Sequence, residues 1–229
     1  MNDTTRNAAR IIATLFLLQM LIAPVVNFRL LAPAMSAPSG FLANAATRAG
    51  QVNVALLLAM VAAALGVGIA ITAWPIVARH SRGAATWFVV LTTVTLASTI
   101  MEGLSLRAML ALSQAYVGAD RANAATIEAL AGPLRAVRIG AHFTSFLLGG
   151  CALLAFYGAL LRYRLVPRPL AVLCLVAVLS LLVAALLPLM GRHTVMALFM
   201  PMGVGQLAVT AWLAIKGFEM QAVPAEVTT

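Results

Sequence analysis

The chain has 229 residues, of which 63% are hydrophobic and only 9% are charged, and its formal net charge is +9. Soluble domains carry about 25% charged residues, so this composition excludes an ordinary water-soluble protein. The basic residues lie at the ends of apolar stretches and form no stripe with interleaved aromatic residues, so no nucleic-acid partner is expected.

Six apolar stretches are long enough to cross a bilayer, which takes about 20 mostly apolar residues in a helix. We therefore expect an all-α polytopic membrane protein, a single-domain bundle of six transmembrane helices over residues 11–216. A cytoplasmic segment, 1–10, precedes the bundle, and a cytoplasmic tail, 217–229, follows it. The expected spans are approximately 11–31, 52–77, 84–115, 134–161, 170–190 and 194–215.

The first span, 11–31, has an alternative interpretation as a signal peptide cleaved near Ala32–Ala34. Its apolar run is longer than the hydrophobic region of a usual signal peptide, and Gln19 and Asn27 interrupt it. We therefore predict that this segment is retained as a membrane span.

The third span is longer than a bilayer requires. It begins near Ala84 and its helical pattern continues to about Ala115, so the helix must tilt or project beyond the membrane. The segment that follows, 118–133, is the most polar connection of the chain and ends at a proline. We predict a polar loop there, before the fourth span.

The loops at 79–83 and 162–169 are short and rich in arginine, whereas the loops on the opposite side are longer and contain acidic residues. Short basic loops stay on the cytoplasmic side of a membrane. This asymmetry predicts that both termini are cytoplasmic.

Ionisable residues inside membrane spans are expensive and therefore candidates for function. On the third span, Ser98, Glu102 and Ser105 share a face, and counting from the cytoplasmic end places Glu102 just beyond the midplane. On the fourth span, Arg138 and His142 share a face at a similar depth. These residues predict a polar ligand-binding pocket in the outer half of the bundle, to which Gln206 of the sixth span contributes. The alternative is a structural ion pair that fixes helix register.

Ser98 or Ser105 with His142 and Glu102 has the residue types of a catalytic nucleophile, base and orienting acid. The sequence around Ser105 is not the G-x-S-x-G of a strained nucleophile turn, however, so we predict no catalytic residue. H-E-x-x-H is absent, and His142 is the only histidine expected well inside the membrane. We therefore expect no metal site and no haem or other cofactor.

Two stretches in the C-terminal half, 157–173 and 205–218, resemble the domain-of-unknown-function family 4386, a group of bacterial six-span membrane proteins. The resemblance covers about residues 10–218, and the first three spans match mainly by hydropathy. It implies the six-span fold, a bacterial inner membrane and, in most members, an acidic residue where this chain has Gln206. It implies no activity.

Three functions remain open on these observations. The first is binding or transport of a small amphiphilic or apolar molecule through the pocket, with membrane lipid and that ligand as the partners. The second is a non-catalytic membrane scaffold or partner subunit, and the third is an intramembrane hydrolase. We favour the first, because it uses the polar groups of the third and fourth spans.

Overall fold

The structure is a computed structural model that describes residues 3–35 and 40–219, and within these ranges it contains helices and turns but no strand. Six helical segments of this part are long and apolar enough to cross a membrane. The prediction of a six-span helical membrane bundle is therefore confirmed. Residues 220–229 of the expected tail lie outside the described ranges.

Four of the long helices begin and end within a few residues of the expected spans, with a short 3₁₀ turn, η3 (Met196–Phe199), before the last of them. They are α4 (Ala49–Val77), α5 (Arg82–Val117), α7 (Arg168–Leu189) and α8 (Met200–Ile215). Local signals explain these bounds. The Ser81 hydroxyl accepts a hydrogen bond from the Ala84 amide at the start of α5, and Pro167 precedes α7.

The first span is a composite of α1 (Asp3–Pro24), η1 (Val25–Leu31) and α2 (Ala32–Met35). The middle piece, η1, is a π-helix of seven residues that follows directly on Pro24. Proline lacks the amide proton of a regular helical turn, and π-helical turns inside longer helices are found often at functional sites. The sequence analysis did not anticipate this widened segment.

The fourth span begins much earlier than expected, because α6 runs from Arg121 to Arg162 and includes the predicted polar loop. The Asp120 side chain accepts a hydrogen bond from the Asn123 amide and caps the helix. The alanine-rich residues that follow favour helix, and Pro133 is tolerated within it. The prediction of a loop over 118–133 was therefore wrong from Arg121 onward.

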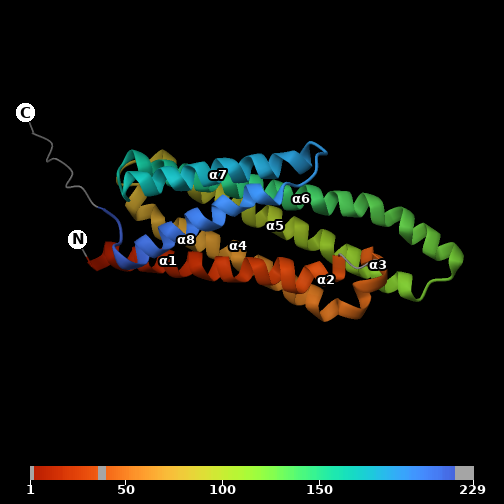
Figure 1. The fold of residues 1–229 in the computed structure, drawn as a ribbon. Coiled ribbons are helices and arrows are strands. Elements are labelled where there is room, and N and C mark those ends of the chain that lie inside the picture. The colour runs from red at the N-terminus through yellow and green to blue at the C-terminus, as the bar shows by residue number, and fades with distance from the viewer. Residues whose placement is uncertain (1–2, 36–39, 220–229) are drawn as a thin grey trace, which may run out of the picture.

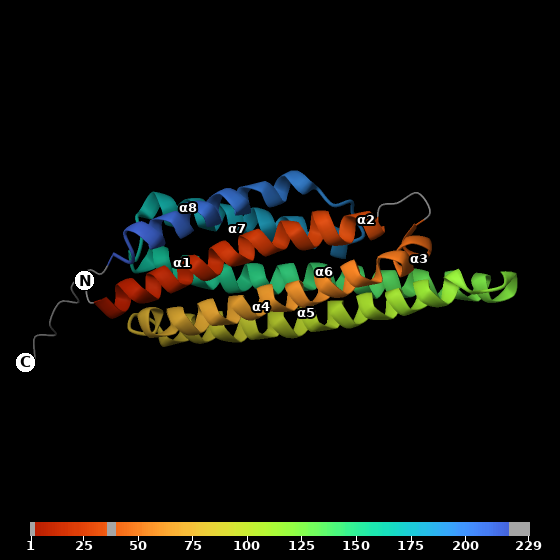
Figure 2. The same ribbon diagram turned by 90° about the horizontal axis from the view of Figure 1, so that it is seen from below.

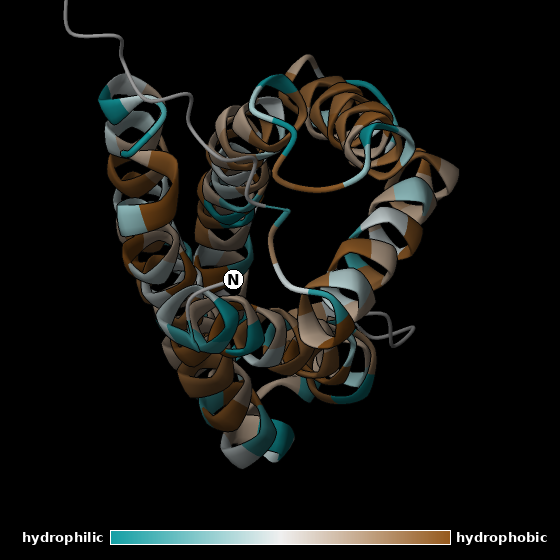
Figure 3. Cartoon of the chain, turned by 90° about the vertical axis from the view of Figure 1, so that its left-hand side faces the viewer, coloured by the Kyte–Doolittle hydropathy of each residue, from teal (hydrophilic) through white to brown (hydrophobic). Residues whose placement is uncertain are grey.

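The long helices form a closed ring in which each packs mainly against two others, in the order α1, α4, α5, α6, α7, α8 and back to α1. One end of the bundle, here called the terminus side, contains the N-terminal end of α1, the C-terminal end of α8 and the α6–α7 turn (Figure 1). The α5–α6 hairpin extends beyond the other helices at the opposite end, here called the hairpin side (Figures 1 and 2). Hydrophobic residues predominate along the helices (Figure 3).

On the hairpin side, two short helical pieces, α3 (Gly40–Asn44) and η2 (Ala46–Arg48), lie between α2 and α4 in the chain and pack against α5. The fully buried Ser113 of α5 holds them in place. Its hydroxyl donates to the Leu42 carbonyl at 2.7 Å and accepts from the Ala46 amide at 2.8 Å. Val52, Leu106 and Leu110 are part of the small apolar core beneath these pieces.

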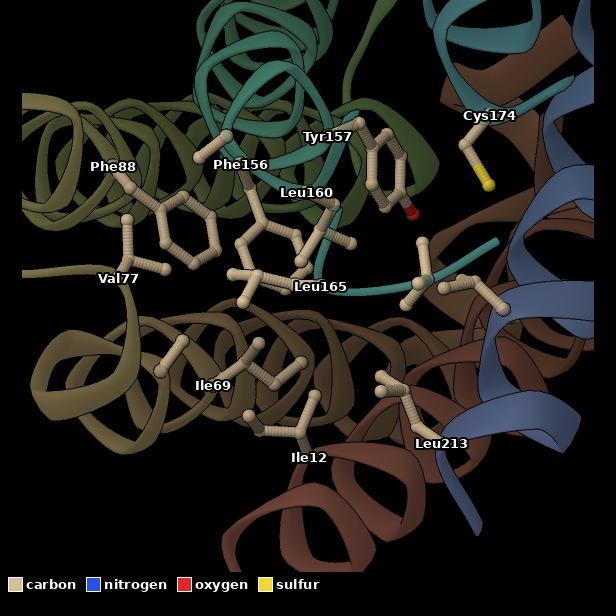
Figure 4. Close-up of a cluster of buried hydrophobic side chains, with 14 of the residues drawn as sticks. Ile12, Ile69, Val77, Phe88, Phe156, Tyr157, Leu160, Leu165, Cys174 and Leu213 are labelled. Atoms are coloured by element: carbon tan, nitrogen blue, oxygen red, sulfur yellow. The ribbon is translucent and has the colours of Figure 1, made fainter. Parts of the chain in front are cut away.

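The main core lies on the terminus side and draws residues from all six long helices. Phe88 stacks on Phe156 with ring centroids 4.7 Å apart (Figure 4). The ring centroid of Phe16 lies 6.4 Å from that of Phe156. These three rings are at most 3% exposed. The ring of helices is therefore sealed on the terminus side by a layer of buried aromatic residues.

Candidate functional site

Glu102 of α5 and His142 of α6 lie in direct contact, as the sequence predicted. His142 Nδ1 is 2.8 Å from Glu102 Oε1, and with its proton on Nδ1 the ring donates to the carboxylate. Both side chains are largely but not fully buried, with exposed fractions of 16% for Glu102 and 25% for His142. The pair joins the two longest helices of the bundle.

Arg138 lies one helical turn from His142 on α6 and completes the cluster. Its Nη2 is 3.8 Å from Glu102 Oε1, and its side chain is 11% exposed. Among the described residues, its Nε finds no hydrogen-bond partner. A guanidinium has five N–H donors, so Arg138 retains donor capacity for a ligand that accepts hydrogen bonds.

The two serines proposed for the pocket use their hydroxyl groups elsewhere. Ser105 is buried and donates to the Met101 carbonyl of its own helix at 2.9 Å. Ser98 donates across to the Ala141 carbonyl of α6 at 3.4 Å. Neither hydroxyl hydrogen-bonds the His142 ring in the described part of the chain, so the residue types of a catalytic triad are present without its geometry.

A small cavity of about 70 Å³, the outer cavity, lies beside this cluster and includes Glu102 and His142 in its lining. The opposite wall belongs to the π-helix η1, through Val26, Asn27 and Leu31. Most of the remaining lining is apolar and comes from α4 and α5. The outer cavity thus combines one polar end with apolar walls.

The position of the cluster along the bundle follows from the helices that it contacts. Phe146, one turn below His142, packs against Phe199 at the start of α8 with centroids 5.5 Å apart. The charged groups therefore lie close to the level of the α7–α8 connection.

Gln206 does not join this cluster. It lines a separate space of about 120 Å³, the central cavity, together with Gln19 of α1 and Thr95 of α5. Gln19 donates through Nε2 to the Ala62 carbonyl of α4 at 2.6 Å. The residues predicted for one pocket therefore belong to two levels of the bundle. Glu102, His142 and Arg138 lie at the level nearer the hairpin side.

The family model of a domain of unknown function (DUF4386) matches residues 11–217 of the chain. The chain belongs to the DUF4386 family. The resemblance seen in the sequence is thereby confirmed, and its extent agrees with the expected 10–218. No curated protein and no solved structure matched the chain.

The two stretches that resemble DUF4386 come together on the terminus side of this family member. Gly205 lies where α8 approaches α7, and at this contact Cys174 Sγ donates to the Gly205 carbonyl at 3.4 Å. After α8, the Glu219 amide donates to the Leu165 carbonyl at 2.7 Å, and Phe218 is buried. In this chain, these stretches therefore hold the α6–α7 turn against α8.

Two features of the candidate site escaped the sequence analysis. The π-helical wall had only Pro24 as its signal, and a proline in a membrane helix has several outcomes. The aromatic contacts of His142 with Phe143 and Phe146, at 5.2 and 4.9 Å, were visible only as residues near it on one helix.

Proposed function

We propose that this DUF4386 protein binds or transports a small amphiphilic or apolar molecule at the outer cavity. The observation that carries the proposal is the Glu102–His142–Arg138 cluster at one end of an apolar-walled cavity. The cluster supplies both donors and an acceptor, so it suits the polar end of an amphiphile. A cavity of about 70 Å³ holds only the polar end of the ligand, so the apolar part extends past Leu31, Leu56 and Leu106 and out of the cavity.

The π-helix η1 supports this assignment independently of the charges. Three of its seven residues line the outer cavity, and such segments cost regular helical hydrogen bonding. A bundle that only needed to span the membrane gains nothing from this distortion. A binding site gains a differently shaped wall.

The proposal includes a location and an orientation. The protein resides in a bacterial inner membrane with both termini in the cytoplasm, which agrees with the short arginine-rich loops at 79–83 and 162–169. The hairpin side then faces outward, and the outer cavity lies near the outer membrane surface. Membrane lipid surrounds the bundle and is one source of the ligand.

The test compares binding of three probes with the same alkyl chain, laurate, dodecanol and dodecylamine, to protein purified in mild detergent. Glu102→Gln and His142→Ala remove the polar end of the cavity. We expect each substitution to weaken binding of the preferred probe by about tenfold, which is the effect of losing one charged hydrogen bond. Glu128→Gln is the matched control, because Glu128 is exposed and bonds Tyr116 instead.

Equal binding by the wild type and all variants would contradict the proposal, as would absence of binding by all three probes. The variants must elute as folded protein, so that weak binding is not confused with unfolding. If Glu102→Gln and His142→Ala only fail to fold, the cluster is a structural ion pair and the outer cavity loses its role.

A scaffold role is the second candidate, and the projecting hairpin favours it. Val117, Leu130 and Val137 on α5 and α6 are 55–62% exposed, and exposed apolar residues beyond the membrane are suited to a protein partner. A stoichiometric partner that copurifies in mild detergent, and is lost on Leu130→Lys, would support this function over ligand binding.

A further inference from the structure

The central cavity differs from the outer cavity in its chemistry. None of its described lining residues is charged. Its polar groups are the side-chain amides of Gln19 and Gln206 and the hydroxyls of Thr92 and Thr95. Both threonines donate to carbonyls of their own helix, at 2.6 and 2.8 Å, which leaves their oxygen lone pairs as acceptors.

Residues from five of the six long helices line the central cavity, which places it within the ring of helices. Two glycines keep it open. A Cβ at Gly66 would lie 3.1 Å from Gln19 Nε2 and 3.4 Å from Thr92 Cγ2, and a Cβ at Gly149 would lie 3.5 Å from Thr95 Cγ2. Side chains at these positions would occupy space that the amides and hydroxyls now face.

Two aromatic layers bound the central cavity. Phe16 and Phe88 form part of its lining, and with Phe156 they make the buried layer that seals the terminus side. On the other side, Phe146 packs between His142 and Phe199. It lies between His142, which lines the outer cavity, and Gly149, which lines the central one.

The layer formed by Phe146 and Phe199 is less buried than the layer on the terminus side. Phe146 and Phe199 are only partly buried, whereas Phe16, Phe88 and Phe156 are at most 3% exposed. Along α5, Thr99 lines the outer cavity and Thr95 lines the central one, and the Thr99 hydroxyl donates to the Thr95 carbonyl at 3.0 Å. One polar stripe of α5 therefore passes both levels.

We propose that the central cavity is a second binding site, for an uncharged group that both donates and accepts hydrogen bonds, and that it is reached from the hairpin side past Phe146. A charged group is disfavoured because no counter-charge lines the space and burial of a lone charge is costly. A cavity of roughly 150 Å³ admits benzene, so this one takes a neutral group of slightly smaller size, such as an amide or alcohol.

The experiment reads the reactivity of a thiol placed in the central cavity. Thr95→Cys is treated with methyl methanethiosulfonate, a small uncharged reagent, in detergent, and each cysteine is quantified by mass spectrometry. Val94→Cys is the matched control at the same depth on the exposed face of α5. The buried native Cys174 reports any loss of fold in every sample.

Access past Phe146 is tested by combining Thr95→Cys with Phe146→Ala. We expect labelling to accelerate about tenfold, as for a site that depends on local opening. Phe143→Ala is the control, since Phe143 also packs on His142 but makes no ring contact with Phe199 in the described structure. Equal acceleration by both variants would overturn the proposed route.

Binding is tested by protection with acetamide and acetate, which have the same shape and differ in charge. Acetamide should slow labelling of Thr95→Cys by about threefold or more, whereas acetate should not. Adding Gly66→Ala should abolish the protection, and Gly140→Ala, where a Cβ meets nothing within 4 Å, should preserve it. Protection by acetate as strong as by acetamide, or none by either, would overturn the site.

The same assay separates two sources of the neutral group. Protection by lauramide at lower concentration than acetamide identifies the polar end of an amphiphile, and the reverse order identifies a free solute. The assay uses neither Glu102 nor His142, so its failure is distinct from a failure of the outer cavity to bind its probes.

Discussion

At the scale of single residues, many polar side chains of this bundle find hydrogen-bond partners in one of two ways. Hydroxyl side chains donate to the carbonyl one turn earlier on their own helix, as Thr92, Thr93 and Ser105 do. A carboxylate only accepts hydrogen bonds, and a helix interior offers it no free donor. Glu102 must therefore find its partners on another helix, and it finds them in His142 and Arg138.

This dependence predicts the stability of Glu102→Gln. Removing one partner of a fully buried charge pair costs about 3–5 kcal/mol. Because these side chains keep 11–25% of their exposure, we expect the free energy of unfolding to fall by about 1–3 kcal/mol. Reversible unfolding in mixed micelles measures it. Glu128→Gln, at an exposed site, should change it by less than about 0.5 kcal/mol, and equal effects would contradict this reasoning.

The same chemistry explains which site residues were predictable. An ionisable residue in a membrane span needs a partner, so Glu102, His142 and Arg138 were identifiable as a group from spacing alone. Serines have a local alternative, so the sequence did not reveal that Ser105 bonds its own helix. Gln206 lines the central cavity rather than the outer one, because an amide side chain can bond many different backbone groups and hydropathy does not encode helix positions around a ring.

At the scale of elements, close helix contacts in this bundle rely on small residues. A Cβ at Gly205 would lie 3.2 Å from Ala177 Cβ and 3.5 Å from Cys174 Cα. The second distance is an ordinary van der Waals contact, whereas the first is tight, and because Ala177 Cβ is fixed to its backbone, α7 and α8 must move apart by a few tenths of an ångström. Small residues allow such approaches between membrane helices.

Gly205→Ala should therefore destabilise the bundle by about 1–3 kcal/mol, the usual cost of overpacking. Gly203→Ala is the matched control on the same helix, because a Cβ there meets nothing within 4 Å. The control should be neutral or gain up to about 1 kcal/mol from better helix propensity. Thermal unfolding of the two purified variants compares them directly, and similar melting temperatures would refute the packing argument.

Element boundaries were predictable where hydropathy changes sharply and not elsewhere. The end of α4 at Val77 and the start of α5 at Arg82 follow a basic break in an apolar sequence. The first part of α6 lacks that change in hydropathy because it lies outside the apolar stretch. The Asp120 cap and the alanine content stabilise the helix there. Polar composition and Pro133 were read as a loop, although both are compatible with an exposed helix.

At the scale of the whole molecule, the two ends of the bundle differ. The terminus side is closed by buried aromatic residues and by the contacts that hold the α6–α7 turn. The hairpin side contains the proposed entrance to both cavities. It also contains the long hairpin, since α5 and α6 have 36 and 42 residues against 22 in α7. This asymmetry agrees with the proposed entry of ligands from the hairpin side.

The asymmetry makes a prediction about depth that spin labels on α5 measure. Val94 lies about 18 Å along the helix from Arg82, and Val117 lies about 53 Å along it. Since the hydrocarbon core is about 30 Å thick, a label on Val94→Cys should prefer oxygen as its relaxing agent, and one on Val117→Cys should prefer water-soluble nickel-EDDA. Both side chains are exposed, at 43% and 62%, so burial does not mask the difference. Oxygen preference at both positions would mean that α5 tilts within the bilayer, and the hairpin would then not project from it.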